Sequence, residues 1–594
     1  MMRFKWLLLT CLFWAPGVLA QNPVLFFSDL TFGPNTGWNG SSTQGAAVTV
    51  WGKNFGATRG SSYITINGAQ LSTSSSYAEW DAIGPARGLE RITFWIPSAA
   101  ATGNGNITVT VNGVTSNALP FQVAPATILF VDVNNGNNNN DGRTTSTAWK
   151  DLWKWTPCLS NDPYHYPSHC NTLGDAQYIM YVRGGTYTTK DPYAGAYNPF
   201  IGVSNPFGSP TAQKAIVGYP GENPIIDTGG GQQSDIIIQL QWAPYGYGAS
   251  YITVAKLTGQ NGAEFYSVWG DYNRIVGNSL LNYRDQDWSG VIFVGNSHHT
   301  SIYGNLFNNC GYDSYKHNIY IKTQPIAAGN SYDQSVLYTE VGYNEFANAY
   351  ASDTHGGVIF LSRDSGQSAQ YIHDYTYIYG NLFHGGNDDY LYSGDSVTLG
   401  GHIYLYNNIF LPQTSNEGGL TVYYGTTQEY FFNNLFYQTN SNNLVNVNYT
   451  ATPTFNNNIW WPTSGTGLDM GGVTSGRATL DHELWYTGPP SNSSPVYITN
   501  TTVGNPLFVS PSGNDFHIQS TSPARGAGIN LYSTLSALPG GKFDYEGKTY
   551  PSSGAWDIGP LQYGSGSTSG GGGGGGGGGT TPPAPPTGLT AVAK

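Results

Sequence analysis

A short asparagine motif recurs through the middle of the chain and limits the possible folds more than any other feature. The seven copies are anchored on Asn278, Asn305, Asn344, Asn381, Asn408, Asn434 and Asn458. The basic unit is about 25 residues long, two steps are longer, and no helical pattern lies between the copies. Such a unit predicts one coil of a parallel β-solenoid with a ladder of stacked asparagine side chains. Hydrophobic residues one and two positions after each asparagine are expected inside.

The composition agrees with an all-β protein. The 594 residues include 79 Gly and 43 Tyr, with abundant Asn and Thr, which suit short strands and tight turns better than helices. The net charge is −13, and Lys and Arg together number only 23. A nucleic-acid partner is therefore not expected, because a phosphate backbone requires a basic face.

The two ends of the chain predict its location and its flexible parts. Residues 1–20 combine Arg3 and Lys5 with an apolar run and a small-residue ending, which is typical of a secretory signal peptide. No later run is long enough to span a membrane. We expect a secreted, extracellular monomer, and attachment to a cell surface stays open. Residues 565–583 contain an unbroken glycine run that predicts a flexible linker, and residues 584–594 resemble the start of a fibronectin type III domain.

Three cysteines remain after the predicted signal peptide. Cys158 and Cys170 lie in one Pro-rich loop, and in an oxidising compartment they are a plausible disulfide. A metal site that uses His165 and His169 is the alternative. Cys310 lies in a strand pattern and is expected to be a buried free thiol.

Residues 21–125 alternate apolar and polar residues in short runs separated by Gly and Asn turns, which predicts a small β-sandwich. The segments VTVWGKNFG, residues 48–56, and VTVNGVTSN, residues 109–117, resemble the IPT/TIG branch of immunoglobulin-like domains. Modules of that branch are usually spacers or adhesion units, so the resemblance implies no catalysis here.

Residues 126–564 contain LFVD with a following Asn-Gly run, YVRGGTY, AIVGYPGENPIID and, near the end, SPARGAG and WDIG. Through these motifs the region resembles the right-handed parallel β-helix superfamily of carbohydrate-active proteins, the pectate lyase-like proteins. The resemblance implies a polysaccharide as the partner, and it implies the fold more strongly than the activity.

Charged residues are concentrated in the two long steps of the repeat, and loops on a rigid scaffold favour binding sites. There the sequence resembles the chondroitinase B and alginate lyase branch, through Ile321-Lys322-Thr323, Asn344-Glu345-Phe346 and the run that ends at Arg363. The resemblance implies that Lys322 is the general base of a β-elimination and that Arg363 is its electrostatic partner. It also implies Ca²⁺, although the acidic ligands of that branch are replaced here by His317, Asn318 and Tyr320.

Elementary chemistry fits this pairing. Removing a proton next to a uronate carboxylate produces an enolate-like dianion that needs positive charge. A lysine can act as the base only if its pKa falls, and a nearby cation such as Arg363 would lower it. If Ile319 and Ile321 face the core, Asn318, Tyr320 and Lys322 face outward together. His317 and Tyr320 are therefore candidate substrate-binding residues.

Further candidates lie in the same region. His355 is a second candidate catalytic residue, with Asp353 beside it. Asp388 and Asp389 form a carboxylate pair of the kind that glycoside hydrolases use. Three hypotheses therefore stay open: a polysaccharide lyase, a glycoside hydrolase on the same fold, and a carbohydrate-binding or adhesion rod without catalysis. Tyr and Trp content supports a carbohydrate partner in all three.

Overall fold

The structure, a computed structural model, describes residues 21–156, 171–192, 199–203, 208–230, 236–240, 248–284, 289–312, 316–325, 333–350, 357–364, 366–368, 370–387, 389–393, 401–412, 419–422, 427–438, 443–462, 467–491 and 495–565. The predicted signal peptide, residues 566–583 of the predicted linker and the final residues lie outside these ranges. So do Cys158, Cys170, Asp353, His355 and Asp388, so the predictions made for them remain predictions.

The N-terminal residues form the predicted β-sandwich, called here the N-terminal sandwich. One sheet has the order β1-β3-β7-β6 and the other β2-β10-β8-β4-β5, with β9 paired to β8. The strands are β1 Val24–Ser28, β2 Phe32–Gly33, β3 Gln44–Lys53, β4 Tyr63–Ile66, β5 Ala69–Leu71, β6 Tyr77–Ile83, β7 Glu90–Pro97, β8 Gly103–Val111, β9 Val114–Thr115 and β10 Leu119–Val123.

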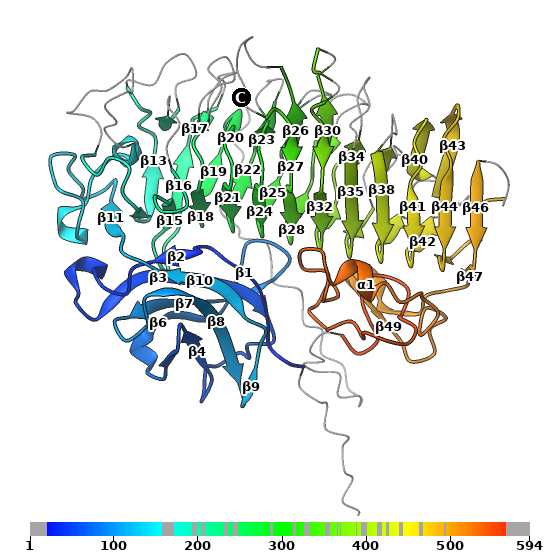
Figure 1. The fold of residues 1–594 in the computed structure, drawn as a ribbon, viewed down its shortest axis with the longest axis horizontal. Helices are drawn as coiled ribbons and strands as arrows, with labels where there is room; N and C mark the ends of the chain where they lie inside the picture. Colours follow the sequence, from blue (N-terminus) through cyan, green and yellow to red (C-terminus); the bar gives the residue numbers. More distant parts are fainter. Residues whose placement is uncertain are drawn as a thin grey trace, which may run out of the picture.

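A parallel β-helix follows, built from three long parallel sheets, as Figure 1 shows. Sheet 1 contains β11 Thr127–Val131, β12 Tyr178–Val182, β15 Lys214–Gly218, β18 Ile252–Ala255, β21 Arg274–Val276, β24 Ser301–Tyr303, β28 Glu340–Gly342, β32 Thr376–Tyr379, β35 Gly401–Tyr406, β38 Thr427–Phe432, β41 Thr454–Asn456, β44 Ala478–Asp481 and β46 Val496–Thr499. Sheet 2 contains β13 Gly185–Tyr187, β16 Pro224–Asp227, β19 Thr258–Gln260, β22 Ser279–Leu281, β25 Leu306–Asn308, β29 Glu345–Ala347, β33 Leu382–His384, β36 Ile409–Phe410, β39 Leu435–Gln438, β42 Ile459–Pro462, β45 Leu484–Trp485 and β47 Thr502–Val503.

Sheet 3 contains β14 Ile201–Val203, β17 Ile236–Leu240, β20 Glu264–Val268, β23 Gly290–Gly295, β26 His317–Thr323, β30 Gly357–Arg363, β34 Asp389–Ser393, β37 Leu420–Val422, β40 Asn443–Tyr449 and β43 Gly467–Val473. Two small pairs are β27 Val336–Leu337 with β31 His373–Asp374, and β48 Phe508–Ser510 with β49 Asp515–Ile518. Helical turns are Trp38–Gly40, Ser74–Ser76, Thr145–Thr147, Leu152–Trp155, Pro511–Gly513 and α1 Tyr532–Leu535. The predicted all-β fold, a parallel β-helix after a sandwich, is confirmed.

The asparagine ladder forms as predicted, at the bend between sheets 1 and 2. The Oδ1 atom of Asn344 accepts hydrogen bonds from the backbone N–H and the Nδ2 atom of Asn305, at 2.9 and 3.0 Å. The same pattern repeats along all seven anchor residues, and each is fully buried. Because the side-chain amides satisfy the backbone at a bend, the ladder fixes the register of successive coils.

Of the two residues predicted to lie inside after each asparagine, the second does so and the first does not. Aromatic rings two positions after the asparagines stack inside, from Phe307 to Phe346 at 4.8 Å and on to Phe383 at 4.7 Å between ring centroids. The residue directly after each asparagine does not join that core. Ile409 and Leu435 belong instead to a cluster with the C-terminal segment, because successive side chains in a strand point to opposite faces.

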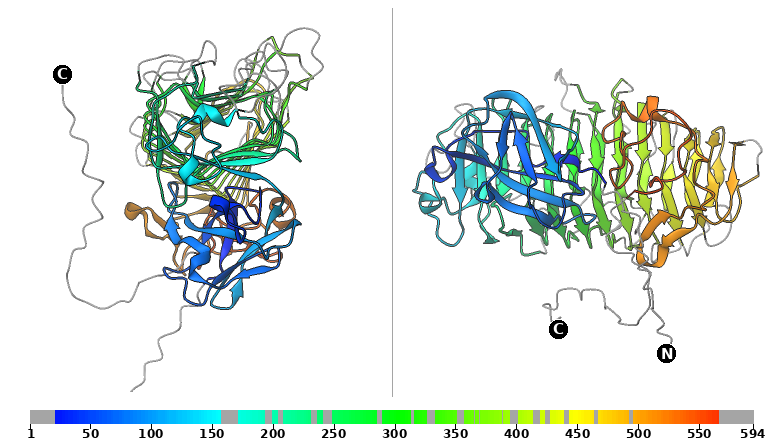
Figure 2. Two further views of the ribbon diagram at one scale, coloured as in Figure 1. Left: turned by 90° about the vertical axis from the view of Figure 1, so that its left-hand side faces the viewer. Right: turned by 90° about the horizontal axis from the view of Figure 1, so that it is seen from below.

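The N-terminal sandwich and the C-terminal segment, residues 504–565, both cover the outside of the β-helix on the side of sheets 1 and 2 (Figures 1 and 2). Arg274 of β21 donates hydrogen bonds to the carbonyl oxygens of Asp29 and Ser28 in the sandwich, at 2.7 and 2.9 Å. Arg87 of the sandwich donates to the carbonyl oxygen of Tyr545 in the C-terminal segment at 2.7 Å. Sheet 3 lies on the other side of the coils, so its outer face is left uncovered by both.

No helix in the described ranges is long and apolar enough to cross a membrane.

Candidate functional site on the outer face of sheet 3

A row of aromatic side chains follows the outer face of sheet 3, with one ring per coil. Phe293, Tyr320, Phe360 and Tyr392 share one register position in β23, β26, β30 and β34. Their ring centroids are 5.6, 5.3 and 5.2 Å apart in that order. Trp269 continues the row, 5.0 Å from Phe293. The row alternates with the core residues of the same strands. Trp269, Phe293 and Phe360 are nevertheless buried, and only Tyr320 and Tyr392 are half-buried, so these two tyrosines are the rings that solvent reaches.

His317 supports this surface from the start of β26. Its ring stacks on Phe360 with centroids 4.4 Å apart and an interplanar angle of 6°. Its Nδ1 atom lies 2.9 Å from the carbonyl oxygen of Gly357. Burial lowers the pKa of His317 to about 3, although the hydrogen bond to Gly357 acts in the opposite direction. The imidazole is therefore neutral at ordinary pH and acts in packing rather than as a charged acid.

Lys322 and Tyr320 both reach the outer face, as predicted, and they carry the polar chemistry of the site. The Lys322 Nζ atom lies 3.4 Å from Asp364 Oδ2 and 5.7 Å from the centroid of the Tyr320 ring. The Tyr320 hydroxyl lies 3.0 Å from the Ser362 hydroxyl in the next coil. Burial by itself lowers the pKa of Lys322, but Tyr320 and the Asp364 carboxylate outweigh it and raise that pKa above its ordinary value. The ammonium is therefore positively charged at neutral pH.

Arg363 does not lie beside Lys322. In the register of β26 and β30, Lys322 is level with Ser362 and Thr323 is level with Arg363. Since successive side chains alternate, Arg363 points to the Thr323 side of the sheet, away from the outer row. Arg363 is buried, and its Nη2 atom donates a hydrogen bond to the Gln367 carbonyl oxygen at 3.1 Å. The prediction that Arg363 lowers the pKa of Lys322 is wrong, because the nearest charge is Asp364 and the pKa is raised.

Asn318 also departs from the predicted alternation, since it is 1% exposed rather than outward. Its neighbours at the same level, Val291 and Val358, both belong to the core. The beginning of each strand therefore places two successive side chains inward. The Asn318 Nδ2 atom has no hydrogen-bond partner within the described part of the chain.

Asp389 lies at the far end of the same face. It is level with Gly357, at the start of β34, and its Oδ2 atom accepts a hydrogen bond from the Thr421 hydroxyl at 2.8 Å. Asp364 follows Gly357 by seven positions, which corresponds to roughly 23 Å along a strand. Two carboxylates at that separation are too far apart for the acid and base of a glycosidase, which lie within about 10 Å of each other.

The calcium site implied by the resemblance is not supported by the donor set of β26. Among the described residues, no group of three or more His, Cys, Asp or Glu side chains could hold a metal ion. His317 is buried against Phe360, and Asn318 is buried next to the core. These side chains do not fit an oxygen-rich calcium site.

Four residues of the site were not predicted from the sequence: Phe293, Phe360, Ser362 and Asp364. A signal for the aromatic pair was present. The strand starts GVIF, HNIY, GVIF and DYLY, beginning at residues 290, 317, 357 and 389, place an aromatic residue at the same fourth position. Reading each long apolar run against its neighbouring coils would have revealed this row. Asp364 had no such signal, because it follows the strand.

Comparison with known proteins identifies the N-terminal module and leaves the rest at the level of distant likeness. Residues 33–123 match the IPT/TIG domain model, which confirms that prediction. A comparison with curated proteins returned no match. Among solved structures, XylC in complex with xylose is 9% identical to this chain, with a TM-score of 0.39. The match covers 73% of this chain and 98% of the XylC chain. The pectate lyase Pel9A is 13% identical with a TM-score of 0.34, covering 74% and 97%. The family 28 exopolygalacturonase of Yersinia enterocolitica is 11% identical with a TM-score of 0.35, covering 81% and 99%.

Proposed function

We propose that the protein degrades a uronate-containing polysaccharide by β-elimination on the outer face of sheet 3. The observation that carries the proposal is the Lys322 ammonium, which lies beside the half-buried Tyr320 ring on the outer face of sheet 3. Aromatic faces stack on sugar rings, and a uronate carboxylate requires a cation. Polysaccharides of this kind are extracellular, so the proposal includes export directed by residues 1–20.

In this proposal, Lys322 stabilises charge rather than removing the proton. Its raised pKa keeps it protonated, so it can bind the uronate carboxylate in place of Asp364 and stabilise the dianion that forms. Tyr320, in its phenolate form, is then the proton acceptor, because its hydroxyl oxygen lies 3.0 Å from the Ser362 hydroxyl and its ring lies beside the Lys322 ammonium. The phenolate takes the C5 proton, the C4–C5 double bond forms, the C4–O bond to the leaving sugar breaks, and water protonates the leaving oxygen.

A carbohydrate-binding surface without cleavage is the second candidate. The ion pair between Lys322 and Asp364 favours it, because an ammonium already satisfied by a carboxylate must exchange partners before it can act on a substrate. Hydrolysis stays the third candidate, since Asp353 and Asp388 lie outside the described residues and Asp389 alone cannot supply both an acid and a base. His355 stays a candidate catalytic residue and Asp353 a candidate site residue; both precede β30 and lie outside the described residues.

The test follows cleavage products of polygalacturonate, alginate, glycosaminoglycans and a neutral glycan. Elimination gives ultraviolet absorbance from unsaturated uronate, hydrolysis gives reducing ends without it, and a binding surface gives neither. For a lyase we expect Tyr320→Phe and Lys322→Ala each to lower kcat/KM by about 100-fold or more. The exposed Lys150→Ala is the matched control and should leave activity unchanged. Full activity in Tyr320→Phe would refute the role given to its hydroxyl.

A further inference from the structure

A cleft of about 260 Å³ lies at the seam between the N-terminal sandwich and the first coils of the β-helix. On the sandwich side it is lined by Glu79 and Ile83 of β6 and by Arg91 of β7. On the β-helix side it is lined by three successive bends between sheets 1 and 2, residues 219–223, 256–258 and 277–279. The seam cleft therefore lies on a different face from the outer row of sheet 3. Its volume is near the lower limit of ligand pockets and suits one small ligand.

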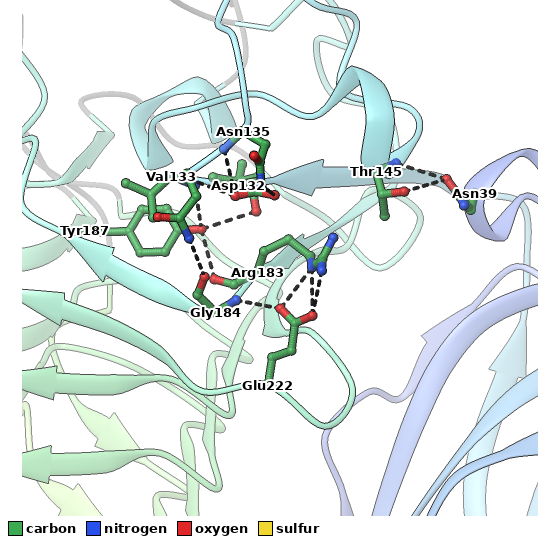
Figure 3. A network of polar contacts seen from close by, with 11 residues as sticks. Asn39, Asp132, Val133, Asn135, Thr145, Arg183, Gly184, Tyr187 and Glu222 are labelled. Carbon is green, nitrogen blue, oxygen red and sulfur yellow. Dashed lines mark hydrogen bonds and ion pairs between the residues drawn. The ribbon is translucent and has the colours of Figure 1, made fainter.

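Glu222, one lining residue of the seam cleft, is held by a network of polar contacts with Arg183 and Gly184, as Figure 3 shows. Arg183 points toward Glu222, with its Nη2 atom 2.7 Å from Glu222 Oε1. The backbone N–H of Gly184 donates to Glu222 Oε2 at 2.6 Å. The Arg183 guanidinium also lies 4.5 Å from the centroid of the Tyr219 ring. A side chain fixed in this way loses little conformational entropy when a ligand binds.

The other charged groups of the seam cleft are paired as well. The Arg91 Nη2 atom lies 2.8 Å from Glu79 Oε1. Lys256 lies at the base, with its Nζ atom 2.8 Å from the Thr49 hydroxyl oxygen and 3.4 Å from Asp29 Oδ2. Since each cation already has an acidic partner, the cleft offers no uncompensated charge to an anion or a cation. A neutral ligand is therefore favoured.

The hydrogen-bonding groups that remain are neutral or singly used. Asn223 accepts a hydrogen bond from the Thr258 hydroxyl through Oδ1, at 2.8 Å, which leaves its N–H donors for a ligand. Ser279 contributes a hydroxyl at the start of β22. Ile83, which is 61% exposed, adds an apolar edge. Polar groups with an apolar edge match a sugar, whose hydroxyls and C–H faces need both.

We infer that the seam cleft binds one neutral sugar residue, at the end or at a branch of a glycan. The inference goes beyond the proposed function, since the seam cleft needs no cleavage chemistry and lies on another face. Bound there, a glycan is held jointly by the sandwich and the β-helix, which gives the docked N-terminal module a direct role in recognition.

Isothermal titration of the full chain with cellobiose, maltose, xylobiose and digalacturonate tests the inference. At least one neutral disaccharide should bind, with the same affinity in wild type and in Lys322→Ala, so a failure here is distinguishable from a failure of the proposed function. Ser279→Trp fills the seam cleft and should weaken binding at least tenfold. Ser510→Trp, at an exposed position of β48, is the matched control and should bind as wild type does.

A second variant tests the inference independently in case Ser279→Trp does not fold. Asn223→Asp keeps the oxygen that accepts from Thr258 but removes the N–H donors, and it should weaken binding at least fivefold while circular dichroism stays unchanged. Binding of digalacturonate alone, no binding of any neutral disaccharide at millimolar concentration, or full binding by both variants would each overturn the inference.

Discussion

Replacing Glu483 by glutamine should remove a pH-dependent loss of stability from the last rung of the asparagine ladder. Glu483 stands where the repeat would place another asparagine, and it is fully buried. Its Oε1 atom accepts hydrogen bonds from the backbone N–H and Nδ2 of Asn458, both at 3.2 Å, and its Oε2 atom accepts from Trp460 Nε1. Burial raises the pKa of Glu483 from 4.5 to about 8, because these three donors offset only part of the desolvation.

The sign and size of the effect follow from this raised pKa. Between pH 4.5 and pH 8 the folded protein binds a proton at Glu483 that the unfolded chain does not. The free energy of unfolding therefore falls as pH rises through this window, at up to about 1.4 kcal/mol per pH unit, or about 3 to 4 kcal/mol from pH 5 to pH 8. Glutamine removes this slope. It keeps an acceptor for Asn458 but loses the hydrogen bond to Trp460, which costs about 1 to 3 kcal/mol at any pH. Glu483→Gln should be less stable than wild type at pH 5 and more stable at pH 8.

Hydrogen exchange measured by mass spectrometry is the assay, because it reports the stability of the last coils locally. Peptides from residues 467–491 should open more readily in wild type at pH 8 than at pH 5, after correction for intrinsic exchange rates. The variant should show no such dependence. Equal pH slopes in wild type and Glu483→Gln would refute the reasoning.

Glu345→Gln is the matched control, since Glu345 is a partly buried glutamate whose pKa is shifted in the other direction. Burial raises the pKa of Glu345, but the hydrogen bond to His384 and the backbone N–H of Arg87 lower it below its ordinary value. Its contribution to stability is therefore present above pH 4.5 and lost as pH falls. Glu345→Gln should be less stable than wild type at pH 8, the opposite of Glu483→Gln.

Three further predictions concern stability and reactivity. Asn344→Ala should lower the free energy of unfolding by about 3 kcal/mol or more, measured by urea denaturation, because it removes the acceptor of the buried Asn305 backbone N–H and Nδ2 and the side-chain donor to the Ile302 carbonyl oxygen. A loss below about 1 kcal/mol would contradict the ladder as a stabilising element. Cys310 is fully buried, and burial raises the pKa of its thiol to about 12. Iodoacetamide at pH 8 should therefore label Cys310 only in denaturant. Rapid labelling of the folded protein, detected by mass spectrometry, would contradict this prediction. Arg87→Ala removes a guanidinium that lies 3.5 Å from the Tyr545 ring centroid. Limited proteolysis should then release the C-terminal segment faster than in wild type. An unchanged cleavage rate would show that this contact does not hold the C-terminal segment in place.

Much of the fold could be predicted because its signals are local and periodic. Each coil repeats an asparagine at a bend and an aromatic residue two positions later, so the solenoid, the ladder and one core column are readable from spacing alone. The outward positions of Tyr320 and Lys322 could also be predicted, because Ile319 and Ile321 alternate with them in one short strand. The position of Asn318 could not, because the two successive inward residues at the strand start break the alternation.

The sequence by itself determined the repeating coil, the N-terminal sandwich and the strand that presents Lys322, because hydrophobic periodicity and turn chemistry act within a few residues. Only the tertiary structure decided which charge Lys322 meets. The run before Arg363 is apolar throughout, so its side-chain direction depends on the register with β26, and that register pairs Arg363 with Thr323 and leaves Asp364 beside the lysine. The docking of the sandwich, and with it the seam cleft, was likewise decided by contacts between segments far apart in the chain, which no local pattern encodes.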